Sequence, residues 1–314
     1  MGVAYLRLML FSLLCSLLLQ GAGCTRAGES KNEVRIGVST LRISLPVFVA
    51  VERGLFAKRG LNVKLQRFDT AQPLADELAT GRLDAGGYVA YPILFAASPP
   101  PPVRVVTAIV EDATHPLSYM LTKKGSGLKG IASLKGKKIG ILPTIAYRRW
   151  LEAILKHDGI EPTDVTIVPT APPLQIDSLS SGGIDALFTG DPMATAALRR
   201  GVAEPMTTSP DVPRVLGDPF LFGTFAVTDA FAKAQPEAAR ALKEALDEAI
   251  SLIMADPAIG RAAMSGYVRE PERAFVEHYP NARYLRSSEV DAAKLDRALE
   301  LVGTSARAAS VALP

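Results

Sequence analysis

Residues 70–85 read TAQPLADELATGRLDA, and residues 170–186 read TAPPLQIDSLSSGGIDA. Both stretches follow a short apolar run, begin with Thr-Ala and a nearby proline, and end at an Asp-Ala pair just after a glycine. The offset is 100 residues between Thr70 and Thr170 and 101 between Asp84 and Asp185, so the second copy holds one extra residue. The same sequence unit therefore occurs twice in one chain.

Each copy predicts a strand, a helix and a second strand. The first strand covers residues 63–68 in one copy and 165–168 in the other, and we expect Thr70 and Thr170 to cap the helices that follow. Proline suits the first helical turn, where its missing N–H costs nothing, and glycine suits the end of a helix. Strand, helix and strand in so short a span indicate a parallel βαβ unit, and two units predict two similar lobes.

The N-terminal segment predicts export. Arg7 precedes an apolar run from Leu8 to Leu19, which is too short for an ordinary membrane-spanning helix but suits a signal peptide. Small residues then precede Cys24, as in a bacterial lipobox, although Gly21 stands where that motif usually has leucine. We expect residues 1–23 to be a lipoprotein signal peptide, Cys24 to be acylated and residues 24–32 to be a flexible tether. Plain secretion with cleavage nearby is the alternative.

Charge and cysteine content narrow the class further. From Cys24 onward the chain has 34 basic and 32 acidic residues, a formal charge of +2 that is too small and dispersed to indicate a nucleic-acid partner. The second cysteine, Cys15, lies in the predicted signal peptide, so we expect neither a disulfide nor a cysteine metal site in the folded part. The sequence predicts an exported globular α/β protein.

The remaining segments predict how the lobes connect. We expect strands at residues 34–39, 103–110 and 117–123, with the first crossing between lobes near residues 111–116. The second lobe begins with a strand at 137–142 and a helix at 147–157, and the Pro- and Gly-rich residues 209–219 should carry the chain back. A strand at 221–228 would rejoin the first lobe. Helices are predicted from Gln235 onward, chiefly at 237–255 and 290–302.

No catalytic constellation is present. His115, His157 and His278 are scattered over predicted loops and helix ends, and His115 is best interpreted as a hinge or capping residue. Residues 125–130 match G-x-G-x-x-G, but no full helix fits before the next strand, so we interpret them as a turn. We expect no catalytic residue, no metal and no cofactor.

The candidate site is made of loops that follow strands and precede helices. In parallel α/β sheets, ligands bind outside the carboxyl ends of the strands, where helix N-termini offer free N–H groups. Hydroxyl, amide and aromatic side chains in these loops suit hydrogen-bonded capture better than bond breaking. The candidate ligand-binding residues are Ser39, Thr40, Arg42, Ser44, Thr70, Gln72, Tyr88, Tyr91, Thr144, Tyr147, Thr170, Thr189 and Asp191.

Several motifs together resemble a known family. Residues 45–63 read LPVFVAVERGLFAKRGLNV, residues 78–85 read LATGRLDA, residues 134–140 read LKGKKIG, and GIDA at 183–186 is followed by Asp191-Pro192. Over about residues 33–260 the chain resembles the nitrate/sulfonate/taurine-type periplasmic substrate-binding proteins of ABC importers. The resemblance implies a two-lobed, type II venus-flytrap α/β fold with a helical C-terminal block.

By the same resemblance, residues 33–113 with 220–314 would form lobe I, and residues 117–210 would form lobe II. The protein would be a monomer that closes on a small molecule between its lobes and docks on a membrane permease. Lipid at Cys24 would anchor it to the membrane, on the periplasmic side or at the cell surface.

The ligand is less narrowly predicted. A sulfonate-like organic anion is favoured by family frequency, with Arg42 and Arg148 as the nearest guanidinium groups, both of which we expect to be solvated. The alternative is a heteroaromatic ligand such as a pyrimidine vitamin precursor, stacked on Tyr88, Tyr91, Tyr147 or Phe188. Relatives of this fold also include cytoplasmic enzymes, the pyrimidine synthases and menaquinone-pathway dehydratases, and a ligand sensor for a membrane receptor is a third option.

Overall fold

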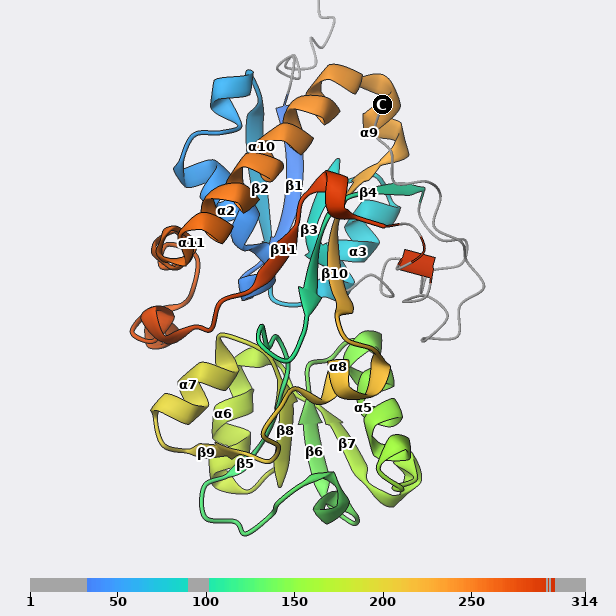
Figure 1. The fold of residues 1–314 in the computed structure, drawn as a ribbon, viewed down its shortest axis with the longest axis vertical. Helices are drawn as coiled ribbons and strands as arrows, with labels where there is room; N and C mark the ends of the chain where they lie inside the picture. Colours follow the sequence, from blue (N-terminus) through green and yellow to red (C-terminus); the bar gives the residue numbers. More distant parts are fainter. Residues whose placement is uncertain (1–32, 90–101, 292, 294, 297–314) are drawn as a thin grey trace, which may run out of the picture.

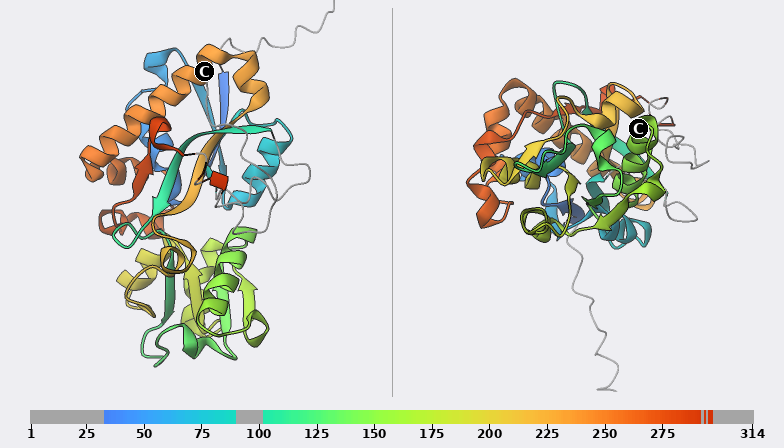
Figure 2. Two further views of the ribbon diagram at one scale, coloured as in Figure 1. Left: turned by 45° about the vertical axis from the view of Figure 1, so that its right-hand side comes forward. Right: turned by 90° about the horizontal axis from the view of Figure 1, so that it is seen from below.

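The chain folds around two separate mixed sheets, one in each of two lobes stacked along the long axis (Figure 1). The structure, a computed structural model, describes residues 33–89, 102–291, 293, 295 and 296. The predicted signal peptide, Cys24 and the tether therefore lie outside the described residues. We refer to the lobe around the six-stranded sheet as lobe I and to the lobe around the five-stranded sheet as lobe II. The left-hand view in Figure 2 shows the same two-part outline.

Lobe I is built on the strand order β11-β4-β10-β3-β1-β2. Strands β1, β2 and β3 pair in parallel, whereas β10 runs antiparallel to both β3 and β4. The strands are β1 (Glu33–Ser39), β2 (Asn62–Phe68), β3 (Ala85–Val89), β4 (Val103–Glu111), β10 (Phe220–Thr228) and β11 (Arg283–Leu285). The predicted return strand at 221–228 is therefore confirmed as the centre of this sheet.

Lobe II repeats the arrangement on a smaller scale, in the order β7-β6-β8-β5-β9. Strands β6, β7 and β8 are parallel, and β5 lies antiparallel to β8. The strands are β5 (Tyr119–Lys123), β6 (Lys138–Ile141), β7 (Thr166–Pro169), β8 (Ala186–Thr189) and β9 (Ala203–Pro205). The predicted turn at 125–130 is confirmed, since only the short 3-10 helix η3 (Ile131–Leu134) follows it before β6.

Helices cover both sheets, and a C-terminal helical block lies on lobe I. The helices are α2 (Leu45–Glu52), α3 (Ala71–Ala79), α5 (Ile145–His157), α6 (Pro172–Ser181), α7 (Met193–Arg199), α8 (Asp211–Leu216), α9 (Asp229–Ala234), α10 (Pro236–Ala255), α11 (Pro257–Met264) and α12 (Glu270–Arg273). Both α10 and α11 pack on α2, and α10 runs obliquely across the lobe (Figure 1). Of the expected helix at 290–302, residues 290 and 291 are not helical, residues 293, 295 and 296 are helical, and the rest lie outside the described residues.

The aspartate of the sequence repeat makes the same strand-to-strand hydrogen bond in both lobes. The side chain of Asp84 accepts a hydrogen bond from the backbone N–H of Arg35 at 2.8 Å, and that of Asp185 accepts one from the N–H of Lys138 at 2.8 Å. Each aspartate thus fixes the start of β3 or β8 against the neighbouring parallel strand. The helices before them end at glycines with positive φ, 69° at Gly81 and 83° at Gly182, as predicted.

The predicted threonine caps of these helices are wrong. Thr70 precedes α3, but its side chain makes no capping hydrogen bond. In the second copy Ala171 occupies the cap position, and the Thr170 hydroxyl instead donates to the carbonyl of Val168 at 3.0 Å. In both helices the capping pattern is present in the sequence, but the local backbone does not bring the hydroxyl to a first-turn N–H.

Two chain crossings join the lobes. Strand β4 leads from lobe I to the turn at 112–118, and β10 returns from α8 in lobe II (Figure 1). The return segment 209–219 was expected to carry the chain back, with no helix predicted in it, but residues 211–216 form α8, which packs on α5. The C-terminal segment also reaches lobe II, because Arg200 donates to the carbonyl of Pro271 at 3.3 Å and lies 5.7 Å above the ring of Phe275. The residue boundaries given above for the lobes stay a prediction.

Candidate functional site

Loops from both lobes meet at one pocket between the sheets. Its empty volume is about 460 Å³, and most of its lining is apolar or aromatic. The lining residues come from the loop after β1, the first crossing, the start of α5, the loop after β8, and β10. They are Leu41, Arg42, Ile43, Leu117, Leu142, Thr144, Tyr147, Gly190, Asp191 and Phe222. We call this space the inter-lobe pocket.

Arg42 is a buried residue at the junction, and the expectation that it is a solvated charge is wrong. It lies in the short 3-10 helix η1 (Arg42–Ser44), and its guanidinium donates to the carbonyls of Pro116 and Pro280. Its Nη2 also lies 3.4 Å from Oδ2 of Asp191. Burial is the largest single effect and lowers the pKa of Arg42, but Asp191, Tyr119, Tyr284 and Glu111 together raise it and leave the pKa above its usual value. Arg42 therefore contacts both lobes and the C-terminal segment at once.

Asp191 is held on the lobe II side of this ion pair. Its Oδ1 accepts hydrogen bonds from the backbone N–H and the hydroxyl of Thr195, at 3.0 and 2.7 Å, in the first turn of α7. Its Oδ2 accepts one from the hydroxyl of Tyr119 at 3.4 Å. Every oxygen of this buried carboxylate is thus directed at a donor or at Arg42, as a buried charge requires.

Glu111 is a second buried acid at the first crossing. Oε1 accepts from the backbone N–H groups of Leu117 and Ser118, at 2.8 and 2.7 Å, and the Ser118 hydroxyl donates to both carboxylate oxygens. Burial raises the pKa of Glu111 to about 7, although these hydrogen bonds and Arg42 act in the opposite direction. Glu111 joins the end of β4 to the start of β5.

Aromatic rings form the wall beside α5. Tyr147 lies 5.0 Å from the ring of Phe188 and 6.4 Å, edge-on, from that of Phe222. Trp150 continues the cluster against Phe220 and Phe222. Because Phe220 and Phe222 belong to β10, this cluster also links the lobes. Burial raises the pKa of Tyr147 well above its usual value, so its hydroxyl stays protonated at neutral pH.

Four of the predicted site residues line the inter-lobe pocket: Arg42, Thr144, Tyr147 and Asp191. Thr144 also caps α5, since its hydroxyl accepts a hydrogen bond from the N–H of Tyr147 at 3.2 Å. Its role toward a ligand stays a prediction, as it does for the other three.

Other predicted residues have internal partners. The Oγ atoms of Ser39 and Ser44 lie 3.3 Å apart, and the N–H of Ser39 donates to Ser44, so the pair stabilises the loop after β1. The Thr189 hydroxyl donates to Gln175 at 2.6 Å, and Gln175 in turn donates to the carbonyl of Thr170. These buried networks position the loops.

The remaining predicted residues are either partly buried or have side chains outside the described part. Gln72 donates to Asp76 one turn along α3, and Thr40 and Thr70 are half-buried. Tyr88 belongs to β3, but its side chain is outside the described part, as is Tyr91 entirely. No ligand contact is therefore assigned to these residues.

Sequence reasoning missed several residues of the junction. Tyr119, Leu117 and Phe222 line the crossings, and nothing in their local sequence distinguishes them from ordinary strand residues. Glu111 carried the clearer signal, a carboxylate at the end of an otherwise apolar strand. His115, interpreted as a hinge or capping residue, lies within the crossing with its Nδ1 2.9 Å from Oδ1 of Asp112, and that interpretation stays a prediction.

The described residues contain no cluster of three or more His, Cys, Asp or Glu side chains that could hold a metal ion. Over the same residues, no helix combines the length and apolar character needed to cross a membrane.

Two α/β lobes joined by two crossings, with strand-end loops meeting between them, define the fold class of the periplasmic binding proteins. Solved structures support this class. The alkanesulfonate-binding protein SsuA of Xanthomonas axonopodis pv. citri, bound to MOPS, aligns over 87% of this chain and 91% of its own, with a TM-score of 0.69 and 20% identity. The nitrate-binding protein NrtA of Synechocystis aligns over 83% and 74%, with a TM-score of 0.62 and 17% identity. The predicted fold class is confirmed.

The chain belongs to the NMT1-like family, whose model matches residues 27–265. It is 28% identical over 241 residues to the taurine-binding periplasmic protein of Escherichia coli, covering 76% of this chain and 70% of that one. It is 26% identical over 222 residues to the yeast 4-amino-5-hydroxymethyl-2-methylpyrimidine phosphate synthase THI13, covering 68% of this chain. The match spans 64% of the length of that synthase. The predicted resemblance to nitrate-, sulfonate- and taurine-type binding proteins is confirmed.

Proposed function

We propose that this protein is the solute-binding component of an ABC importer, which captures a small organic molecule between its lobes and delivers it to a membrane permease. The observation that carries the proposal is the inter-lobe pocket, where loops at the strand ends of both sheets converge. A taurine-binding relative and the shared fold of sulfonate- and nitrate-binding proteins support it. In this proposal the protein is exported, anchored through lipid at Cys24, monomeric and not an enzyme.

For the ligand, the pocket lining favours the heteroaromatic alternative. Arg42 is the cation in the described lining, and its charge is already balanced by Asp191 at 3.4 Å. An anion entering the pocket would meet a neutral ion pair and would have to compete with Asp191. The rings of Tyr147 and Phe222 and the side chains of Leu41, Ile43 and Leu142 suit the faces of a flat, uncharged molecule.

A sulfonate-like anion is the second candidate. The names of the taurine-binding relative and of the alkanesulfonate-binding neighbour favour it. The N-terminus of α5, which opens onto the pocket at Thr144, supplies partial positive charge to an anionic group.

The test is a thermal-shift screen of the purified protein with sulfonates, nitrate, bicarbonate, pyrimidines, flavins and aromatic acids. A ligand at a hundred times its Kd should add about 2.7 kcal/mol to the free energy of unfolding, a shift of a few degrees in Tm. A pyrimidine hit with no sulfonate response supports the heteroaromatic ligand, and the reverse supports the anion. If no compound shifts Tm and native mass spectrometry finds no bound molecule, the binding proposal fails.

The ligand identified in this screen can also be used to distinguish a binding protein from an enzyme. The yeast relatives are synthases, so a hit from the pyrimidine group should be incubated with the protein and followed by mass spectrometry. A binding protein returns its ligand unchanged, whereas conversion of the ligand would assign this chain to the enzymatic branch of the fold.

A further inference from the structure

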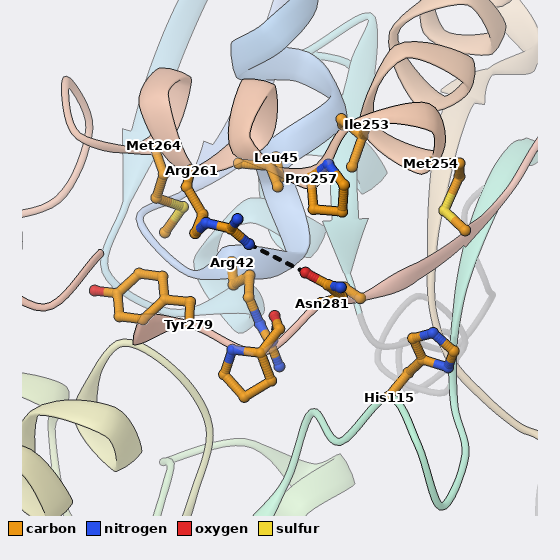
Figure 3. A pocket seen from close by; sticks show the side chains of 12 residues that line it. Arg42, Leu45, His115, Ile253, Met254, Pro257, Arg261, Met264, Tyr279 and Asn281 are labelled. Carbon is orange, nitrogen blue, oxygen red and sulfur yellow. Dashed lines mark hydrogen bonds between the residues drawn. The ribbon is translucent and has the colours of Figure 1, made fainter. Parts of the chain in front are cut away.

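A second pocket lies outside the inter-lobe pocket, on the side where the C-terminal block meets the first crossing. Its empty volume, with open solvent included, is about 600 Å³. Helices α2, α10 and α11, the segment before β11 and the turn at His115 surround it (Figure 3). We call it the lateral pocket.

The floor of the lateral pocket is apolar and comes from three helices. Leu45 is the first residue of α2, Ile253 and Met254 end α10, and Met264 ends α11. Met254 is 45% exposed at the rim, whereas Met264 is fully buried. Two unbranched methionine side chains let such a surface adapt to the shape of an apolar group.

The polar side of the lateral pocket is formed by Arg261. Its Nη1 donates to Oδ1 of Asn281 at 3.1 Å, and in Figure 3 its side chain reaches across the pocket toward Asn281. Its Nε is buried and has no hydrogen-bond acceptor among the described residues. The nearest carboxylate, Oε2 of Glu277, lies 3.9 Å from Nε, beyond hydrogen-bond distance, and belongs to a side chain that is 76% exposed.

A buried donor without an acceptor is costly, and in native proteins such a group usually has a partner. The guanidinium uses Nη1 for Asn281, which leaves Nε with the adjacent Nη2, the edge that a carboxylate binds with two parallel hydrogen bonds. An exposed Glu277 fills that position only loosely. A carboxylate would match this edge of the guanidinium in both charge and geometry.

We propose that the lateral pocket binds a small organic carboxylate with an apolar body, its carboxylate on Arg261 and its body on Leu45, Ile253 and the two methionines. Arg42 lines this pocket as well as the inter-lobe pocket, so the two sites share one wall. Arg42 is the one described lining residue that the two pockets have in common, so the lateral pocket is a second site, separate from the one assigned to the transported solute.

The test uses 4-fluorobenzoate as the probe and ¹⁹F NMR titration of the purified protein as the measurement. The neutral isostere 4-fluorobenzamide is the matched probe without charge. We expect saturable binding of the benzoate and at least tenfold weaker binding of the benzamide, because the charge-assisted pair with Arg261 is lost. Equal binding of the two probes, or no binding at millimolar concentration, would overturn the proposal.

Three variants locate the probe. Arg261→Met keeps the apolar stem and removes the guanidinium, and should weaken benzoate binding at least tenfold. Met254→Trp fills the pocket from its exposed rim and should also block binding. Glu277→Gln removes the competing carboxylate and should tighten binding by roughly two- to fivefold, which a purely apolar contact would not show.

Two controls keep this test independent of the solute site. Arg240→Met removes an exposed arginine from α10 and should leave benzoate binding unchanged. Thr144→Leu alters the inter-lobe pocket and should also leave it unchanged. If Thr144→Leu abolishes benzoate binding while Arg261→Met does not, the probe occupies the inter-lobe pocket and the lateral site is refuted, whatever the fate of the transport proposal.

Discussion

The Nη2 atom of Arg42 and the Oδ2 atom of Asp191 lie 3.4 Å apart across the junction of the lobes, with side chains that are 5% and 0% exposed. Arg42 follows the first strand of lobe I, and Asp191 follows a strand of lobe II at the equivalent edge of its sheet. The same guanidinium holds the carbonyls of Pro116, in the crossing, and Pro280, in the C-terminal segment. The geometry of this ion pair therefore depends on the relative position of the two lobes. We expect its loss to change both the free energy of unfolding and the overall shape of the protein.

Replacing Arg42 with methionine should destabilise the protein by about 3–5 kcal/mol. The substitution leaves Asp191 as a buried charge without its cation and removes the donors to two carbonyls. Urea denaturation measures the loss, and Arg42→Met combined with Asp191→Asn should cost at least 1 kcal/mol less than the sum of the single changes. Small-angle scattering should also show a larger radius of gyration for Arg42→Met.

The matched control is Arg240→Met, which removes an arginine from an exposed pair with Glu237 at 3.4 Å. It should change the free energy of unfolding by less than about 0.5 kcal/mol. If Arg42→Met lowers the free energy of unfolding by no more than this control does, the junction ion pair does not stabilise the fold.

Glu111 should make stability fall as pH rises toward neutrality. Its pKa is about 7 in the folded protein against 4.5 as the reference value, so the folded state binds the proton more tightly than the unfolded state does. The resulting stabilisation is fully present below pH 4.5 and is lost as pH rises through about 7, by roughly 2–3 kcal/mol between pH 5 and pH 8.

Glu111→Gln isolates this effect, because glutamine resembles the protonated acid and still accepts from Leu117 and Ser118. The difference in unfolding free energy between the wild-type protein and Glu111→Gln should shift by roughly that amount over the same pH range. A difference that is constant from pH 5 to pH 8 would show that Glu111 does not titrate there.

The repeat should show energetic coupling between a strand glycine and the aliphatic residue before the aspartate. A Cβ on Gly140 would lie 2.5 Å from Cδ1 of Ile184, and one on Gly37 would lie 2.6 Å from Cδ1 of the equivalent Leu83. Gly140→Ala should therefore cost about 1–3 kcal/mol through overpacking. Ile184→Val removes the clashing methyl group, so the double variant should be more stable than the sum of both costs predicts. Strict additivity in denaturation experiments would contradict this packing.

The sequence was sufficient for much of this architecture because its signals are local. The glycines at 81 and 182 end the helices of their own βαβ units, so reading each unit alone places its strands and helices within a few residues. The partners of Asp84 and Asp185 lie outside those units, on Arg35 and Lys138. Helix α8 was missed because Pro210 and Gly217 flank it. Its Asp211 forms an ion pair with Arg214, which also forms one with Asp158 on lobe II. Because Asp158 is distant in the chain, the local sequence pattern does not predict this contact.

The junction could be predicted only in part for the same reason. The rule about strand ends brought Arg42, Thr144, Tyr147 and Asp191 to one place, and the structure does so as well. It gave no information on what each side chain would contact. Arg42 was expected in solvent because its partners, Pro116, Asp191 and Pro280, lie at least 74 residues away in the chain. Burial of a charge depends on such distant partners and not on the charge itself.

Thr144 should separate ligand binding from helix capping. With a ligand from the thermal-shift screen, Thr144→Leu should abolish binding, since the side chain lines the inter-lobe pocket, and should cost about 1 kcal/mol through loss of the cap on Tyr147. Thr144→Ser keeps the hydroxyl and the cap, and should retain affinity within about threefold. Isothermal titration calorimetry measures both, with Thr166→Leu as an exposed control on β7 that should bind normally. If Thr144→Leu binds as tightly as the wild-type protein, the ligand does not occupy the space beside α5, and the site must lie elsewhere along the junction.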